Sequence, residues 1–142
     1  MKILLDSNIL IYSLNKGSNY YTKAVNILGS RKNFCIAEQN IIEAYRVITS
    51  NKQFADKVYT PSKAWKQLGI IVDNVPMIFK SERTLGLLQD LVLKYKLVSY
   101  QIYDAALVAL MIENGVNEIY TNNDKDFKKF KEIKVINPFT TA

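Results

Sequence analysis

Residues 2–11 read Lys-Ile-Leu-Leu-Asp-Ser-Asn-Ile-Leu-Ile, and this stretch decides the fold. The apolar run that ends at Leu5 predicts a buried strand, and the apolar run after Asn8 predicts a helix. Asp6 therefore stands at the carboxyl end of a first strand, where open α/β sheets bind their ligands. Asp6, Ser7 or Asn8 could each also serve as the N-cap of that helix.

Asp104 stands in similar surroundings, at the start of the apolar segment 105–112. That segment is apolar on nearly every side, which predicts a buried helix. A carboxylate in its first turn interacts favourably with the helix dipole, but burial costs free energy unless a cation or hydrogen-bond donors compensate. Asp104 is thus a second candidate for a functional acid.

Apolar runs alternate with helical patterns along the chain, which is typical of βα units that build a parallel sheet in an α/β fold. We predict strands at residues 2–5, 34–36, 117–121 and 133–136. We predict helices at residues 7–14, 20–29, 38–49, 61–69, 81–95, 103–114 and 125–130. Pro61 suits the first turn of its helix, and Gly115 suits the position after a helix. With no repeat, low-complexity tract or linker, residues 1–142 are expected to form one domain.

The chain contains no histidine and one cysteine, Cys35. This composition excludes Ser-His-Asp and Cys-His nucleophile systems, HExxH zinc sites, internal disulfides and CxxC motifs. Cys35 lies between Phe34 and Ile36 and is predicted to pack as a small apolar side chain. Reactive chemistry is therefore left to side chains that carry oxygen.

The net charge is +6, from 19 basic and 13 acidic residues, and most of the basic ones are lysine. Such a charge favours a polyanionic partner recognised through its backbone, although a merely solvated surface is the alternative explanation. The chain begins Met-Lys and then enters a strand, unlike a signal peptide, and no stretch approaches the roughly 18 apolar residues of a membrane span. We expect a cytoplasmic protein without a membrane segment.

Three further acids lie where they could join Asp6 and Asp104. Glu43 lies within the predicted helix 38–49, although Arg46, three residues later, could pair with it on the surface. Asp124 and Asp126 follow a short strand, where one could cap the next helix and the other face the crevice. Thr121, Asn122 and Asn123 supply neutral hydrogen-bonding groups beside them.

These acids can converge on one crevice. Carboxylates within a few ångströms raise one another's pKa unless a divalent cation neutralises them. Oxygen ligands without imidazole or thiolate suit Mg²⁺ or Mn²⁺. The expected chemistry is hydrolysis of a phosphodiester, in which water activated by the ion attacks phosphorus.

Four segments, in order along the chain, resemble motifs of the PIN domain, and within that superfamily those of the small VapC-type ribonuclease toxins of toxin–antitoxin pairs. The segments are residues 5–11, 42–49, 103–109, and 124–127 with 137–139. The resemblance implies a three-layer α/β/α sandwich with a central parallel sheet and an endoribonuclease that depends on Mg²⁺ or Mn²⁺. It also implies a homodimer that acts on RNA and is neutralised by a cognate antitoxin.

The resemblance also assigns roles to residues. Asp6, Glu43 and Asp104 would be metal-site acids, and Ser7 or Asn8 would orient Asp6 or a metal-bound water. The closing motif makes Asp124 the fourth, metal-facing acid, whereas another register puts Asn123 at that position and makes Asp126 the acid. The extra residue in 121–123 blurs this register, and residues 98–101 lack the glycines that some relatives have before Asp104.

Lysines follow the last motif and could form a rim that holds the RNA backbone, although charge runs are usually solvated faces. They are Lys125, Lys128, Lys129, Lys131 and Lys134. Several tyrosines could stack on bases or form core or dimer contacts. They are Tyr20, Tyr21, Tyr45 and Tyr103.

Three other functions share part of this sequence pattern. A haloacid-dehalogenase-like phosphatase also begins with an aspartate after its first strand, but it needs a second aspartate where this chain has Asn8. A catalytically silent PIN-like module that binds RNA or protein is disfavoured, because an unused acidic cluster is costly and repels RNA. A housekeeping PIN nuclease without an antitoxin is the remaining alternative.

Overall fold

The computed structural model describes residues 2–30, 32–50 and 58–140. Within them, five strands form one sheet in the order β3-β2-β1-β4-β5, and every neighbouring pair is parallel. The strands are β1 (Ile3–Leu5), β2 (Phe34–Ala37), β3 (Met77–Ile78), β4 (Glu118–Tyr120) and β5 (Lys134–Ile136). The helices are α1 (Ser7–Ser13), α2 (Tyr21–Gly29), α3 (Glu38–Ile48), α4 (Pro61–Asn74), α5 (Thr84–Tyr95), α6 (Gln101–Glu113) and α7 (Asp124–Phe127).

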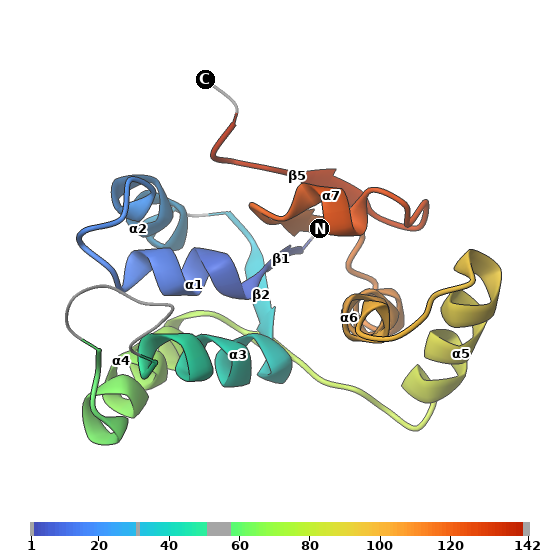
Figure 1. Ribbon diagram of the computed structural model, residues 1–142, viewed down its shortest axis with the longest axis horizontal. Coiled ribbons are helices and arrows are strands. Elements are labelled where there is room, and N and C mark those ends of the chain that lie inside the picture. Colours follow the sequence, from blue (N-terminus) through green and yellow to red (C-terminus); the bar gives the residue numbers. More distant parts are fainter. Residues whose placement is uncertain (1, 31, 51–57, 141–142) are drawn as a thin grey trace.

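Helices cover both faces of this sheet, as Figure 1 shows with α1 to α4 on one side and α5 and α6 on the other. Successive side chains of a strand point to opposite faces. Leu4 therefore packs in the cluster that includes residues of α5 and α6. Leu5 packs in the cluster that includes residues of α1 to α4. The predicted three-layer α/β/α sandwich is confirmed.

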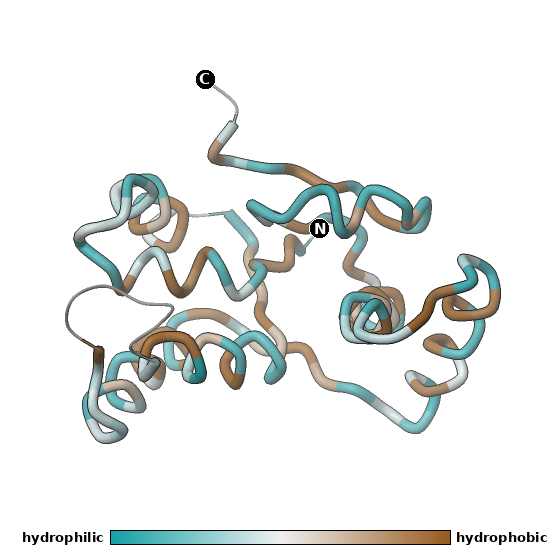
Figure 2. The backbone as a smooth tube through the Cα atoms, in the orientation of Figure 1, coloured by the Kyte–Doolittle hydropathy of each residue, from teal (hydrophilic) through white to brown (hydrophobic). Residues whose placement is uncertain are grey.

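The central strands β1 and β2 are apolar because both of their faces are covered. Leu4, Leu5, Cys35 and Ile36 are fully buried, and Figure 2 shows the central strands largely in the hydrophobic colour. The prediction for Cys35 is confirmed, and burial raises the pKa of its thiol to about 11. No helix of the described residues is long and apolar enough to cross a membrane.

The predicted helix signals occur where expected. Thr60 caps α4 by accepting a hydrogen bond at Oγ1 from the Lys63 backbone N–H (3.3 Å), and Pro61 is the first helical residue. Gly115 follows α6 with a φ of +68°, a left-handed conformation that glycine adopts without strain.

Some element boundaries were predicted wrongly. The strand β3 was missed because its two residues are too short to show an alternating pattern. Helix α4 continues to Asn74 instead of ending at residue 69, since Leu68 and Ile71 extend its buried face past Gly69. Helix α7 begins at Asp124 and ends at Phe127, earlier than the predicted range 125–130.

Candidate active site

Asp6 lies where β1 ends and α1 begins, and it is the N-cap of α1. Its Oδ1 accepts from the Ser7 backbone N–H (2.8 Å), and its Oδ2 accepts from the Thr121 hydroxyl (2.7 Å) and from Asn8 Nδ2 (3.3 Å). Only 6% of the residue is exposed. These donors fix the orientation of the carboxylate at the carboxyl edge of the sheet.

The surroundings of Asp6 have opposing effects on the pKa of its carboxyl group. Burial raises the pKa of Asp6, whereas the hydrogen bonds from Thr121 and Ser7 lower it. The negative charge of Glu43 raises this pKa further. The balance is a rise, so the site holds a carboxylate that a cation would stabilise.

Thr121 and its neighbours bind the loop after β4 to the start of α1. The backbone N–H of Asp6 donates to the Tyr120 carbonyl (3.0 Å), which brings the next residue, Thr121, beside the Asp6 side chain. Thr121 Oγ1 accepts from Asn8 Nδ2 (3.2 Å) and from the Asn123 backbone N–H (2.9 Å). Thr121 is fully buried, so its hydroxyl has a fixed set of partners and a fixed direction.

Asp104 is half-buried in the first turn of α6. Burial is the main cause that raises the pKa of Asp104 to about 6, followed by the charges of Asp126, Asp6 and Glu43. Lys129 opposes this rise. Acids that follow β1 or lie on α3 and α7 therefore all raise the pKa of Asp104 on α6.

Asp124 and Asp126 have different surroundings. Asp124 Oδ1 accepts from Asn137 Nδ2 (3.0 Å), and Oδ2 forms a salt bridge with Lys128 Nζ (3.1 Å). These two contacts lower the pKa of Asp124. Asp126 is exposed, and of the neighbouring charges it has the largest effect on Asp104. Asp124 is thus paired with Asn137 and Lys128, and the choice of the fourth acid between Asp124 and Asp126 stays a prediction.

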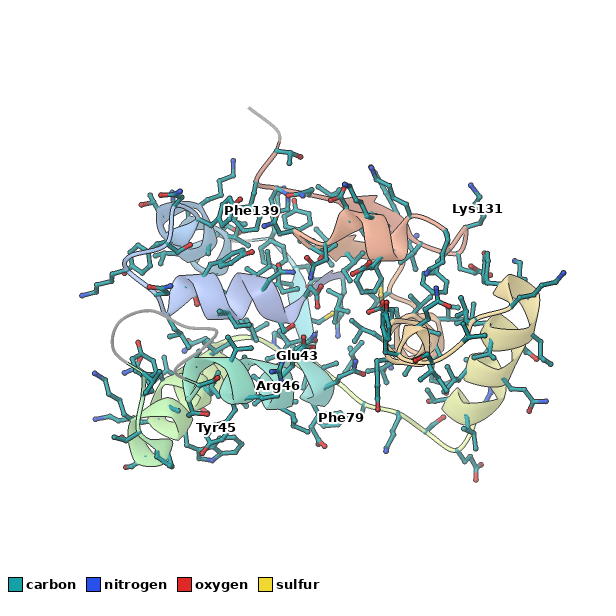
Figure 3. The ribbon with its side chains drawn as sticks, in the orientation of Figure 1. Glu43, Tyr45, Arg46, Phe79, Lys131 and Phe139 are labelled. Carbon is teal, nitrogen blue, oxygen red and sulfur yellow. The ribbon has the colours of Figure 1, made fainter. Side chains whose placement is uncertain are left out.

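Glu43 is exposed on α3, and Figure 3 places it beside Arg46 near the middle of the molecule. Its charge raises the pKa of both Asp6 and Asp104. Near it, Gln39 Nε2 donates to the Tyr103 carbonyl (3.2 Å) and so joins α3 to the residue that precedes Asp104. That Glu43 shares one metal site with the other acids stays a prediction.

The acids of the described residues do not lie close enough together to form a complete metal site. Across residues 2–30, 32–50 and 58–140, no group of three Asp, Glu or Cys side chains is close enough to hold an ion. Carboxylates without a counter-charge repel one another and are expected to stand apart. The oxygen donors present are nevertheless the type that Mg²⁺ and Mn²⁺ bind, so the residues fit such an ion in chemistry.

The predicted RNA-binding lysines occupy different places. Lys129 acts on Asp104, whereas Lys128 is paired with Asp124. Lys125 is exposed, and Lys131 projects outward, away from Glu43 (Figure 3). Of these lysines, Lys129 is the one whose charge lowers the pKa of Asp104.

Sequence reasoning did not assign a role to Asn137. This residue is 9% exposed, and besides Asp124 its Nδ2 also donates to Asn122 Oδ1 (3.1 Å). Its Oδ1 accepts from the Phe139 backbone N–H (2.9 Å). Asn137 therefore joins the chain after β5 to the loop after β4. The only sequence signal was its place in the closing motif.

The family model described as the PIN domain matches residues 3–133, and the chain therefore belongs to the PIN domain family. No curated protein sequence matches the chain. Several solved structures share its fold at low sequence identity, and three of them illustrate the range.

The first is a chain of VapBC2 from Rickettsia felis bound to a DNA fragment from their promoter, with TM-score 0.68 and 20% identity over 96% of this chain and 98% of that chain. The second is VapC20 from Mycobacterium tuberculosis, a toxin that cleaves the sarcin–ricin loop, with TM-score 0.66 and 15% identity over 93% and 98%. The third is VapBC-1 from nontypeable Haemophilus influenzae, with TM-score 0.69 and 13% identity over 99% and 100%. At these identities the likeness concerns the fold.

Proposed function

We propose that this protein is an endoribonuclease that depends on Mg²⁺ or Mn²⁺ and acts as the toxin of a toxin–antitoxin pair. The observation that carries the proposal is that the charge of Glu43 raises the pKa of Asp6, and that the charges of Asp126, Asp6 and Glu43 raise the pKa of Asp104. Membership of the PIN domain family and the fold shared with toxin–antitoxin proteins support the same conclusion.

Asp6, Glu43, Asp104 and Asp126 are the residues that would hold the ion. When bound, a divalent cation supplies Lewis-acid chemistry and an activated water for attack on phosphorus. Thr121 and the Ser7 N–H keep the Asp6 carboxylate oriented, with Asn8 as a further donor. Lys129 would hold a phosphate of the RNA backbone beside the acids.

An antitoxin and a second copy of the chain are the proposed protein partners. Large apolar side chains are exposed near the acids, as in Ile42 (59%) on α3 and Tyr103 (66%) on α6, together with Phe79 (63%). Exposed apolar patches of this kind are typical of protein contact surfaces. They support a protein partner without distinguishing the antitoxin from the second copy.

The nuclease is tested with purified protein and end-labelled RNA. Cleavage is expected with Mg²⁺ or Mn²⁺ and is expected to stop on addition of EDTA. The variants Asp6→Asn and Asp104→Asn should lose cleavage, whereas the control Asp90→Asn, an exposed acid on α5, should retain it. Cleavage that persists in EDTA, or full activity in both site variants, would contradict the proposal.

The toxin role needs a separate experiment. Expression of the protein should arrest growth, and co-expression of a small neighbouring gene should relieve the arrest. Arrest by the Asp104→Asn variant would dissociate toxicity from cleavage. Active nuclease without toxicity or any such partner would instead favour a housekeeping nuclease.

A further inference from the structure

A cavity of about 420 Å³ lies away from the acids, between α2 and the sheet. Its walls come from α2 and the segment after it, from the start of β2, and from β4 and β5. None of its lining residues belongs to the acidic site. Its volume is near the lower end of the range for small-molecule sites, roughly 300–1,000 Å³, which suits one compact ligand.

The rim of the cavity is cationic. Lys23, Lys32 and Ser30 line it, and all three are exposed. In the described part of the chain, salt bridges join Lys94 to Glu132 and Lys128 to Asp124, so neither rim lysine takes part in one. Two ammonium groups at one opening attract an anion.

Lys32 is held in place by the cavity wall. Its Nζ donates to the Tyr120 hydroxyl (2.8 Å), and this hydrogen bond is the main cause that raises the pKa of Lys32. The charge of Glu118 contributes least to that rise. An ammonium group carries three donors, so Lys32 keeps two for a ligand.

The inner wall is aromatic and aliphatic. The rings of Phe34 and Tyr120 meet edge to face with their centroids 5.4 Å apart, and Ile27 and Ile136 complete this surface. Phe34 and Tyr120 are both largely buried, and each ring packs against the other. Apolar walls with a few convergent polar groups are typical of sites for flat, ring-containing ligands.

We propose that this cavity binds a nucleoside monophosphate, either free or as one nucleotide of an RNA chain. Its phosphate lies against Lys23 and Lys32, and its base lies against the wall of Phe34 and Tyr120. An anion alone leaves the apolar wall uncovered, and an uncharged ring leaves the two ammonium groups without a counter-charge. The proposal goes beyond the nuclease function and uses other residues, so each can fail without the other.

The test is calorimetric titration of the full chain with AMP, CMP, GMP and UMP, and with adenosine and inorganic phosphate for comparison. At least one nucleotide should bind saturably, and adenosine and phosphate should each bind about tenfold more weakly or worse. Lys32→Ala and Lys23→Ala should each weaken nucleotide binding by about tenfold, because each removes a charged donor. Lys66→Ala, which changes an exposed lysine on α4, is the matched control and should bind like the unaltered chain.

The source of the nucleotide is tested in the Asp104→Asn variant, which should leave RNA uncut. If a short RNA displaces AMP and Lys32→Ala weakens the binding of that RNA, the cavity holds a nucleotide of the strand. If the RNA does not displace AMP, the ligand is a free nucleotide. The absence of binding by all four nucleotides at millimolar concentration overturns the proposal. Phosphate that binds as tightly as AMP, or rim variants that bind like Lys66→Ala, also overturn it.

Discussion

The Asp104→Asn variant should make the metal-free protein more stable while it abolishes cleavage. The pKa of Asp104 rises from its ordinary value of 3.8 to about 6, and burial with the charges of Asp126, Asp6 and Glu43 are the causes. That rise corresponds to about 3 kcal/mol between the ionised and protonated forms. Because Asp104 is partly exposed, solvent screening reduces the stability effect to about 1–2 kcal/mol. Asparagine keeps the shape and removes the repelled charge.

The direction in which stability changes with pH follows from proton binding. A carboxyl whose pKa is higher in the folded than in the unfolded state makes the folded protein lose stability as pH rises from about 3.8 to about 6. The advantage of Asp104→Asn should therefore be largest above pH 7 and should largely disappear below pH 4. Loss of the favourable contact of the carboxylate with the α6 dipole offsets it by some 0.3–1 kcal/mol.

The assay is urea unfolding of the unaltered chain, Asp104→Asn and the control Asp90→Asn at pH 4 and pH 7.5, all in EDTA. Asp90 is exposed on α5, so its variant tests the same change in net charge without the acidic surroundings. Added Mg²⁺ should then stabilise the unaltered chain and the control more than Asp104→Asn. The reasoning is refuted if Asp104→Asn is no more stable than the control at pH 7.5, or if its advantage does not change with pH.

Three further outcomes follow from the site. Asp126→Asn should reduce cleavage by about a hundredfold or more, because the loss of a metal ligand removes several kcal/mol of transition-state stabilisation. Asp124→Asn should mainly lower the melting temperature. The reverse result in RNA cleavage assays would restore Asp124 as the fourth acid. Thr121→Val should cost about 1–3 kcal/mol in urea unfolding, because it leaves buried donors unpaired, and about 10- to 100-fold in activity. Lys129→Ala should weaken RNA binding and reduce the slope of the logarithm of the binding constant against the logarithm of the salt concentration by about one. Lys131→Ala should leave the affinity and this slope nearly unchanged.

Local patterns predicted the positions of Asp6 and Asp104 because each acid is adjacent to a long apolar run. An apolar strand or helix must be buried, and its end then fixes where the neighbouring polar residue emerges. The structure accordingly has Asp6 as the cap of α1 and Asp104 in the first turn of α6. These are consequences of a few adjacent residues, so no distant contact was needed to foresee them.

The choice between Asp124 and Asp126 could not be made in this way. Both acids lie in the same short helix, and a large part of the difference between them comes from Asn137, which is 13 residues further along the chain and donates to Asp124. A pattern within residues 118–127 contains no information about that contact. The same limit applies to Lys129, whose effect on Asp104 depends on how α7 packs against α6.

The register of β1 against β4 determines the positions of residues in both proposed sites, the acidic site and the cavity. Leu5 is paired with Tyr120, so Thr121 follows beside Asp6 and donates to its carboxylate. Successive residues of a strand point in opposite directions, and Tyr120 accordingly points to the other side, where it binds Lys32 and lines the cavity. A slip of one residue would exchange the two directions and remove the Asp6 hydrogen bond and the aromatic wall together. A substitution that weakens the pairing of β1 with β4 should therefore impair both cleavage and nucleotide binding. Thr121→Val should impair cleavage and leave nucleotide binding unchanged.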